Sequence, residues 1–254
     1  MNSYNLYVEK FAFEGFYVSG SDIKTRYGPE KFGDFVELIM GKNKNKSPYV
    51  KSIDGHRVYS SYILNQTSDI VKELLLTLKN KSKTLNISEK DLNTFIKRTA
   101  IHLYATVPDI KKTDLVITTK SSSDLAKRLA KEIASKSSNH TLLFAPDTII
   151  KAKIDNIKLS DDIPHANMRK ILTNIIEKAR NKKSFEMKKV PGKLRKFIYD
   201  FLNLSPDIIK KIEGKNVLVV DDYLISGSTL QESFRMIDFL NPDSIQAVCL
   251  FKLS

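Results

Sequence analysis

Hydrophobic residues along this chain are spaced in two ways, and the spacing changes near residue 110. Aromatic and aliphatic residues alternate with polar ones over residues 4–18 and again over residues 49–63. Such alternation predicts half-buried strands, and Asp54-Gly55 supplies a residue pair that tolerates positive φ in the tight turn of a hairpin. The first part of the chain is therefore expected to contain strands or hairpins.

Other segments of residues 1–110 have apolar residues at helical spacing. Apolar side chains recur on one face over residues 68–79, and Ser88 with Asp91 resembles a capping box ahead of a second such run. A further helix is expected over residues 29–40. Residues 1–110 are thus predicted to form an α+β region.

From residue 111 onward, short apolar runs alternate with amphipathic segments. Because strands that alternate with helices form parallel sheets with crossover helices, residues 111–254 are predicted to be an α/β domain with a twisted parallel sheet flanked by helices. The expected strands are 114–119, 141–145, 216–220 and 244–252, and the expected helices are 122–135, 164–179, a short one starting at Pro206, and 230–240. The last strand–loop–helix–strand unit places its loop at the carboxyl end of a strand, where ligands bind in open α/β sheets.

Composition and charge limit the class of protein. The chain has 254 residues, 41% of them hydrophobic, and one cysteine, Cys249, which allows a sizeable core and excludes an internal disulfide framework. The first residues lack the pattern of a signal peptide, and no run approaches about 18 apolar residues, so a cytoplasmic protein without membrane contact is expected. The net charge of +13 favours anionic partners, either nucleic acid or phosphorylated metabolites, although biased use of Lys and Asn explains part of it equally well.

The loop in the last unit is suited to bind a phosphate. Backbone N–H groups from Ile225 to Thr229 can converge on a phosphate, because they precede a helix whose dipole is positive at that end. The hydroxyls of Ser226, Ser228 and Thr229 can assist, and Gly227 permits a close approach.

Two carboxylates stand at the end of the preceding strand. Asp221 and Asp222 are acceptors suited to a pair of vicinal ribose hydroxyls, or to water around a metal ion. The loop therefore matches a sugar phosphate. On the residues alone, the alternative is that the Asp pair caps the helix and Gly227 makes an ordinary turn.

The segment VLVVDDYLISGSTL, Val217 to Leu230, closely resembles the phosphoribosyl pyrophosphate signature of type I phosphoribosyltransferases. The resemblance extends over residues 110–254. It implies the type I phosphoribosyltransferase fold, with residues 225–229 holding the ribose 5-phosphate. It also implies that Asp221 and Asp222 are catalytic residues that hold the ribose hydroxyls.

Two further segments resemble parts of this family. ITTKSSSDLAKRLA is similar to the pyrophosphate loop, which implies that Thr119, Lys120 and Ser121 contact the leaving group and that Lys120 is catalytic. NPDSIQAVCLFK looks like the strand of hypoxanthine-guanine members whose terminal Lys contacts the purine, and Lys252 would match that position. At both positions a solvated surface lysine is the alternative.

A basic stretch, residues 178–196, lies between the pyrophosphate loop and the signature. The family has a flexible loop in this place that closes over the reacting centre, so the stretch is a candidate lid. A solvated cationic helix face and a nucleic-acid contact are the alternatives.

The resemblance implies a glycosyltransferase of nucleotide metabolism that transfers phosphoribose from phosphoribosyl pyrophosphate to a nucleobase. Mg²⁺ would be bound mostly by the substrate, and no residue is expected to bind it directly, although Asp221 and Asp222 could contact it through water. Purine-salvage members have a further segment after this strand that completes the base pocket, whereas the sequence here stops at Ser254, so the resemblance implies a hood from residues 1–110. A homodimer is common in the family. The alternative is a non-catalytic regulator or a nucleic-acid-binding protein with the same fold.

Overall fold

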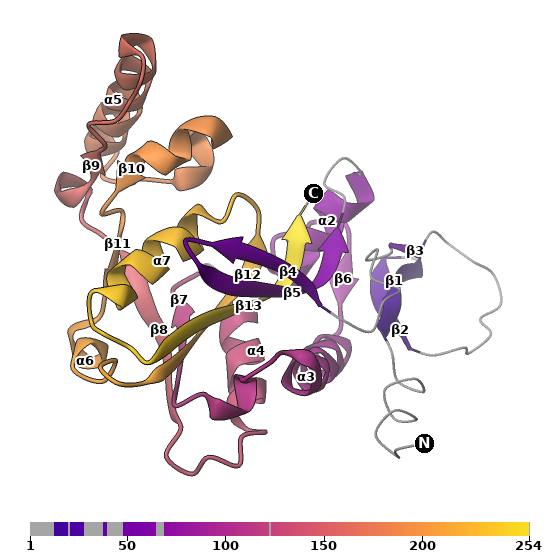
Figure 1. Ribbon diagram of the computed structural model, residues 1–254. Helices are drawn as coiled ribbons and strands as arrows, with labels where there is room; N and C mark the ends of the chain where they lie inside the picture. The colour runs from indigo at the N-terminus through magenta and orange to yellow at the C-terminus, as the bar shows by residue number, and fades with distance from the viewer. Residues whose placement is uncertain are drawn as a thin grey trace.

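The computed structural model describes residues 13–19, 21–27, 38–39, 48–64, 69–121 and 123–253. A seven-stranded sheet in the order β11-β8-β7-β12-β13-β5-β4 forms its centre (Figure 1). The inner strands run parallel, whereas β4 and β11 at the two edges are antiparallel to their neighbours. The strands are β4 Tyr49–Ile53, β5 His56–Leu64, β7 Leu115–Thr119, β8 Leu143–Lys151, β11 Leu202–Leu204, β12 Asn216–Leu224 and β13 Ser244–Leu253. The predicted α/β class with a mainly parallel sheet is confirmed.

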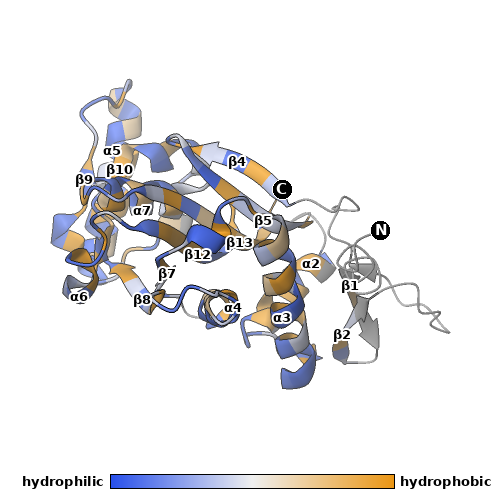
Figure 2. Cartoon of the chain, turned by 60° about the horizontal axis from the view of Figure 1, so that its bottom comes forward, coloured by the Kyte–Doolittle hydropathy of each residue, from blue (hydrophilic) through white to orange (hydrophobic). Residues whose placement is uncertain are grey.

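The two faces of the sheet bury separate cores. On β12, Leu218 and Val220 pack in one core, and Val217 and Val219 pack in the other. Because β12 is buried on both faces, its sequence is a continuous apolar run rather than an alternation. The first core contains residues of α2 (Asp69–Leu78), α3 (Glu89–Thr106) and α4 (Leu125–Ala134), and the second contains residues of α5 (Ala166–Asn181) and α7 (Ser228–Asp238). Along α3, hydrophobic and hydrophilic residues alternate as an amphipathic helix requires (Figure 2).

Helix α3 begins where the capping box predicts. The Oγ of Ser88 accepts a hydrogen bond from the backbone N–H of Asp91 at 3.0 Å, which satisfies one of the free donors of the first turn. A 3₁₀ helix, η1 (Ile110–Lys112), then leads from α3 to β7. The strand–helix–strand units predicted after residue 111 are confirmed, but β8 and β12 extend to Lys151 and Leu224, well past the predicted ends at residues 145 and 220.

A second, smaller sheet has the order β3-β1-β2-β6. It consists of β1 Phe13–Ser19, β2 Asp22–Tyr27, β3 Leu38–Ile39 and β6 Asn86–Ile87. The ring of Phe16 on β1 lies 4.9 Å from the ring of Phe95 and 6.5 Å from that of Phe251, measured between centroids. These aromatic contacts connect the small sheet to the first core.

The N-terminal predictions are confirmed only in part. The strand predicted within residues 4–18 is present from Phe13, where β1 and β2 form a hairpin, and residues 1–12 lie outside the described residues. Most of the helix predicted over 29–40 also lies outside them. Where that segment is described, Leu38–Ile39 form a strand paired with β1, so the helix prediction is wrong there, because pairing with β1 overrides helical spacing.

Strand β5 lies beside β13, although the two are far apart in the sequence. Their register runs from Arg57 opposite Gln246 to Leu64 opposite Leu253. The β4–β5 hairpin, which precedes residue 110, therefore completes the same sheet that carries β7 and β12. The division of the chain at residue 110 stays a prediction.

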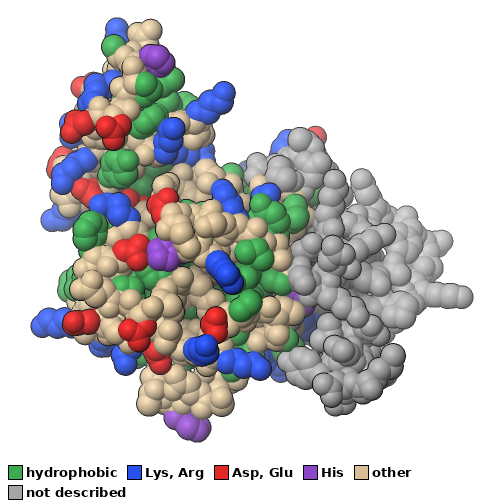
Figure 3. Space-filling view, in the orientation of Figure 1, with side chains coloured by type: hydrophobic (Ala, Val, Ile, Leu, Met, Phe, Trp, Pro, Cys, Tyr) green, Lys and Arg blue, Asp and Glu red, His purple; other side chains and the backbone are tan. Residues whose placement is uncertain are grey.

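Between β8 and β11, over residues 152–201, the chain leaves the sheet and forms a projecting unit. Helix α5 stands away from the sheet in Figure 1, and Lys and Arg side chains gather over it in Figure 3. Its inner side buries Leu172 and Ile176, as the predicted helix over 164–179 requires. Its other elements are η2 Ile154–Asn156, β9 Lys158–Leu159, η3 Met187–Lys189, η4 Gly192–Phe197 and β10 Ile198–Tyr199, and α6 Pro206–Ile209 follows after the chain returns to the sheet at β11. No helix in the described part of the chain is long and apolar enough to cross a membrane.

Candidate functional site

Two buried carboxylates occupy the end of β12. The strand continues through Asp221 and Asp222 instead of ending at Val220, and the two side chains are 7% and 8% exposed. The Oδ1 atom of Asp221 accepts hydrogen bonds from the Oγ1 of Thr119 and from the N–H of Asp222, both at 2.9 Å. The Oδ2 of Asp222 accepts a hydrogen bond from Ser123 at 3.0 Å. The predicted acid pair and the turn after β7 therefore meet at one edge of the sheet.

The environment of Asp221 favours its protonated form. Burial raises the pKa of Asp221 to about 7, and the nearby charge of Asp222 acts in the same direction. The hydrogen bonds from Thr119 and from the Asp222 N–H lower that pKa, but they do not cancel the cost of burial. Asp221 can therefore gain or lose a proton near neutral pH.

Lys79, which sequence reasoning missed, completes this cluster. Its Nζ lies 3.4 Å from the Oδ2 of Asp222 and 4.1 Å from the centroid of the Tyr223 ring. Lys79 follows α2 directly, so a residue from before position 110 reaches the acid pair. The only signal in the sequence is the spacing of Lys72, Leu75, Leu76 and Lys79, which places these residues on one side of a helix.

Replacing Lys79 with Met is expected to raise the pKa of Asp221 further, because the Lys79 charge lowers it in the native protein. The measurement is a ¹³C NMR titration of the Asp carboxyl groups in both proteins. Lys72→Met is the matched control, since Lys72 pairs with Asp69 at 2.7 Å and not with the acid pair. An unchanged Asp221 titration in Lys79→Met would show that the ammonium does not act on this carboxyl.

The loop after β12 has the geometry expected at the amino end of a helix that binds phosphate. Gly227 has φ +87°, and α7 begins at Ser228. The Oγ atoms of Ser226 and Ser228 lie 2.9 Å apart, and Ile225 is exposed. The positive φ favours glycine at position 227, and a Cβ there would also lie 2.6 Å from Cδ1 of Ile53, which would have to move aside.

Arg195 from the basic stretch reaches this loop. Its Nη1 donates a hydrogen bond to the Oγ of Ser226 at 3.2 Å, while its Nε donates to the carbonyl oxygen of Val190 at 2.9 Å. A guanidinium is therefore held beside the start of α7. The sequence predicted a basic segment here, but not which of its cations reaches the loop.

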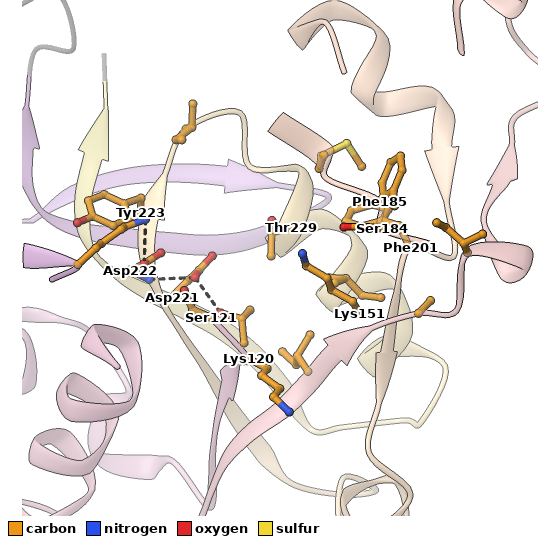
Figure 4. A pocket seen from close by; sticks show the side chains of 18 of the residues that line it. Lys120, Ser121, Lys151, Ser184, Phe185, Phe201, Asp221, Asp222, Tyr223 and Thr229 are labelled. Atoms are coloured by element: carbon orange, nitrogen blue, oxygen red, sulfur yellow. Dashed lines mark hydrogen bonds and ion pairs between the residues drawn. The ribbon is translucent and has the colours of Figure 1, made fainter. Parts of the chain in front are cut away.

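The acid pair, the loop and the turn after β7 open into one cavity of about 1190 Å³ (Figure 4). Among the predicted site residues, the ones that line it are Thr119, Lys120, Ser121, Asp221, Asp222, Ile225 and Thr229. Ser226, Gly227 and Ser228 belong to the same loop but do not line the cavity. In Figure 4 the side chain of Lys120 points away from the acid pair.

Lys252 does not line this cavity. Its Nζ lies 4.1 Å from the centroid of the Tyr49 ring, on the neighbouring hairpin. The adjacent residue, Leu253, lines the cavity instead. A contact between Lys252 and a base stays a prediction.

Comparison with known families agrees with the signature. A family model described as a phosphoribosyl transferase domain matches residues 94–253, more than half of the chain. The chain belongs to the phosphoribosyl transferase family. The type I fold implied by Val217 to Leu230 is confirmed, and this phosphoribosyl transferase domain carries its signature at the carboxyl end of β12.

Several solved structures resemble this phosphoribosyl transferase domain at low sequence identity. A hypoxanthine phosphoribosyltransferase from Staphylococcus aureus is 17% identical, with 65% of each chain covered and a TM-score of 0.35. A hypoxanthine phosphoribosyl transferase from Trypanosoma cruzi is 16% identical over 65% of this chain and 66% of that one, with a TM-score of 0.36. A purine phosphoribosyltransferase from Pyrococcus horikoshii is 14% identical over 63% of this chain and 82% of that one, with a TM-score of 0.33. No curated protein matches the chain.

Proposed function

We propose that this domain binds phosphoribosyl pyrophosphate and transfers its phosphoribosyl group to a nucleobase, releasing pyrophosphate. The observation that carries the proposal is that the acid pair, the residue 225–229 loop and the turn after β7 open into a single cavity. An acceptor nitrogen forms a bond to C1 of the ribose as the C1–O bond to pyrophosphate breaks. The electron pair of that bond leaves with pyrophosphate, and the N–H proton of the base passes to solvent.

Each part of the donor has a group to hold it. The 225–229 loop at the start of α7 would bind the 5-phosphate, since the helix dipole and backbone N–H groups favour an anion there. Asp221 and Asp222 would accept hydrogen bonds from the ribose hydroxyls. Thr119, Lys120 and Ser121 would contact the pyrophosphate. Holding the donor at both ends aligns C1 with the acceptor, which is the main source of rate in such transfers.

The residues present fit a Mg²⁺ ion that is bound largely by the substrate. In the described part of the chain, no group of three or more His, Cys, Asp or Glu could hold a metal by itself. Asp221 and Asp222 nevertheless offer carboxylate oxygens at the cavity wall, and Mg²⁺ commonly keeps several waters beside one or two carboxylates. Bound there, the ion would neutralise charge on the departing pyrophosphate.

Helix α2 would serve as the hood. Lys72, Leu75, Leu76 and Lys79, in and directly after α2, line the cavity, and Leu76 is 42% exposed. Apolar side chains beside a ribose site suit the flat face of a base. The accepting base, a cytoplasmic location and a homodimer remain predictions.

Replacing Arg195 with Gln is expected to weaken binding of ribose 5-phosphate roughly tenfold, because the guanidinium that donates to Ser226 places a positive charge beside the proposed 5-phosphate loop. Binding of pyrophosphate should stay unchanged, since Arg195 contacts Ser226 and not the turn after β7. Isothermal titration with each compound separates the two effects. Lys193→Gln, an equal change of charge at an exposed residue nearby, is the control. Equal losses for both compounds would place Arg195 at the leaving group instead.

The proposal is tested by titrating phosphoribosyl pyrophosphate with Mg²⁺ into the protein, and by assaying pyrophosphate release with a panel of nucleobases. Binding with release for one base would establish the transferase and identify its acceptor. A protein that binds no phosphoribosyl pyrophosphate would refute the proposal.

A non-catalytic role is the second candidate, and one observation favours it. The Lys120 side chain, the expected cation of the pyrophosphate loop, points away from the acid pair in Figure 4. A sensor of phosphoribosyl ligands, or a nucleic-acid-binding regulator, needs no cation at the leaving group. Donor binding without pyrophosphate release for any base would favour this reading.

A further inference from the structure

The projecting unit, residues 152–201, carries a large share of the positive charge of the protein. Its 50 residues hold thirteen Lys and Arg against six Asp and Glu, a net charge of +7. The other 204 residues hold the remaining +6 of the total of +13. Biased use of Lys would raise the charge along the whole chain, so it does not account for this concentration. A surface of this charge attracts polyanions.

Helix α5 presents one row of amide and ammonium groups to solvent. All three Asn and both Lys residues of the helix belong to this row. Their spacing of three, four, four and three residues keeps them within a narrow arc, on the side away from the buried Leu172 and Ile176. All five are exposed, and we call them the α5 stripe: Asn167, Lys170, Asn174, Lys178 and Asn181.

The α5 stripe is available to a partner. In the described part of the chain neither Lys170 nor Lys178 forms an ion pair, whereas Arg180 on the flank lies 3.9 Å from Asp155. None of the five residues lines the phosphoribosyl cavity. Because α5 stands away from the sheet (Figure 1), a large partner can reach the stripe.

The chemistry of the stripe favours nucleic acid over a membrane surface. A helix that lies on a membrane turns a row of large apolar residues outward, whereas α5 turns Leu172 and Ile176 inward. Lys side chains contact phosphates, and one Asn amide can both donate to and accept from the edge of an adenine. Ile171, which is 45% exposed beside the stripe, suits the methyl group of thymine.

The composition and width of α5 favour double-stranded DNA among the nucleic acids. Proteins that bind single strands stack the bases on aromatic side chains, and none of the 16 residues of α5 is aromatic. An α-helix with its side chains is about 10–12 Å wide, which matches the major groove of B-form DNA, about 12 Å wide. The major groove of duplex RNA is too narrow and deep for side chains to read.

We propose that α5 binds double-stranded DNA in its major groove. Lys170 and Lys178 contact phosphates, and the three Asn side chains contact base edges. The stripe extends along about 21 Å of helix, at about 1.5 Å per residue, which is long enough to contact several base pairs. The stripe is separate from the phosphoribosyl cavity, so this inference goes beyond the proposed function and does not rest on it.

Fluorescence anisotropy with labelled duplexes of about 20 base pairs, or two helical turns, tests the proposal. Duplex DNA is expected to bind at least tenfold more tightly than duplex RNA or either single strand of the same length. Because Asn pairs with adenine, an A·T-rich duplex should bind more tightly than a G·C duplex. Equal or tighter binding of duplex RNA or a single strand would overturn the proposal, as would the absence of DNA binding at low salt.

Co-sedimentation with phosphatidylserine vesicles tests the competing class of partner. We expect the vesicles to bind more weakly than duplex DNA at the same salt concentration. Binding to vesicles without binding to DNA would overturn the proposal and identify a membrane surface as the partner of this unit.

Replacing both lysines of the stripe locates the DNA on α5. Lys170→Gln/Lys178→Gln is expected to weaken DNA binding roughly tenfold and to reduce the slope of log K against log salt concentration by about two, since each phosphate contact releases about one counterion. Lys90→Gln/Lys97→Gln, which removes two exposed lysines from α3, is the matched control. Equal losses in both variants would show that the total charge binds DNA without the stripe, and would overturn the proposal.

Two further variants give results that a misfolded protein cannot give. Glu177→Gln removes an exposed carboxylate beside the stripe and is expected to tighten DNA binding roughly twofold. Replacing all three Asn of the stripe with Ala should remove the preference for A·T-rich DNA and leave the salt slope unchanged, because the amides carry no charge. A preference that survives this change would overturn the base contacts.

Titration of phosphoribosyl pyrophosphate into Lys170→Gln/Lys178→Gln separates this inference from the proposed function. Donor binding should be unchanged, because neither lysine lines the cavity. A variant that loses donor binding together with DNA binding would overturn the separation of the two surfaces. A wild-type protein that binds DNA but no donor would refute the proposed function and support α5 as a DNA-binding helix.

Discussion

Replacing Asp221 and Asp222 together with Asn is expected to abolish binding of phosphoribosyl pyrophosphate and, at the same time, to make the protein more stable at pH 8. Binding should fall by roughly a hundredfold or more, because two charge-assisted hydrogen bonds to the ribose hydroxyls are lost. Stability should rise because the variant no longer holds the Asp221 carboxylate, whose pKa is raised by burial, in a site where its charged form is poorly solvated. The acid pair would then be retained for its chemistry and not for the fold.

The ionisation of Asp221 determines whether stability rises or falls with pH. The pKa of Asp221 is raised from 3.8 to about 7 in the folded protein, so between these values the folded state holds more protons than the unfolded state. Stability therefore falls as the pH rises through this interval and stays lower above it. The difference is on the order of 2–4 kcal/mol.

Urea unfolding at pH 5 and pH 8, together with isothermal titration of the donor, measures both effects. The variant should lose most of the difference in stability between the two pH values. Asp243→Asn, at an exposed carboxylate before β13, is the control and should behave as the wild type. A double variant that is less stable than wild type at pH 8 would contradict the proposed cost of the acid pair.

Replacing Gly227 with Ala is expected to lower the free energy of unfolding by about 2–4 kcal/mol, the sum of strain at positive φ and crowding in a packed site. The added Cβ would lie 2.6 Å from Cδ1 of Ile53, which is on the β4 strand and 9% exposed. Either the terminal methyl of Ile53 or the loop must move to relieve this contact. Because the same loop is proposed to hold the 5-phosphate, affinity for the donor should fall as well.

Two other glycines serve as controls that separate backbone strain from crowding. Gly214 also has positive φ, +63°, but an added Cβ there meets nothing within 4 Å, so Gly214→Ala should show strain alone. Gly192→Ala, in equally open space and without positive φ, should change little. A double-mutant cycle with Ile53→Val isolates the crowding between positions 53 and 227. Equal costs for Gly227→Ala and Gly214→Ala, with no coupling to Ile53, would show that packing does not restrict the loop.

The sequence predicts the parts of this site that depend on local pattern. The apolar run Asn216 to Val220 predicts a strand because it is buried on both faces, and parallel strands bring their carboxyl ends to one edge. The hydrogen bond between Thr119 and Asp221 follows from that arrangement. Ser88 likewise begins α3 because its side chain satisfies a local N–H group.

Strand ends and distant partners could not be predicted in this way. Strand β8 continues to Lys151 instead of ending at Ala145, although Pro146 and Asp147 are residues that usually end strands. Asp147 has φ 58°, and its N–H donates to the Oγ1 of Thr118 at 2.8 Å, so an irregularity is absorbed by the neighbouring strand. Lys79 reaches Asp222 across the tertiary fold, which no local spacing encodes.

The pairing of β5 with β13 makes the folding unit larger than the segment by which the family is recognised. The family match begins at residue 94, but β5 ends at Leu64, so an excised fragment of residues 94–253 would lack this strand. Its β13 would then present a bare row of N–H and C=O groups, and Phe251 would lose its contact with Tyr62. Such an edge recruits strands from other molecules. Residues 56–64 are thus expected to protect the edge of β13, in the segment that the family model matches, from pairing with other molecules.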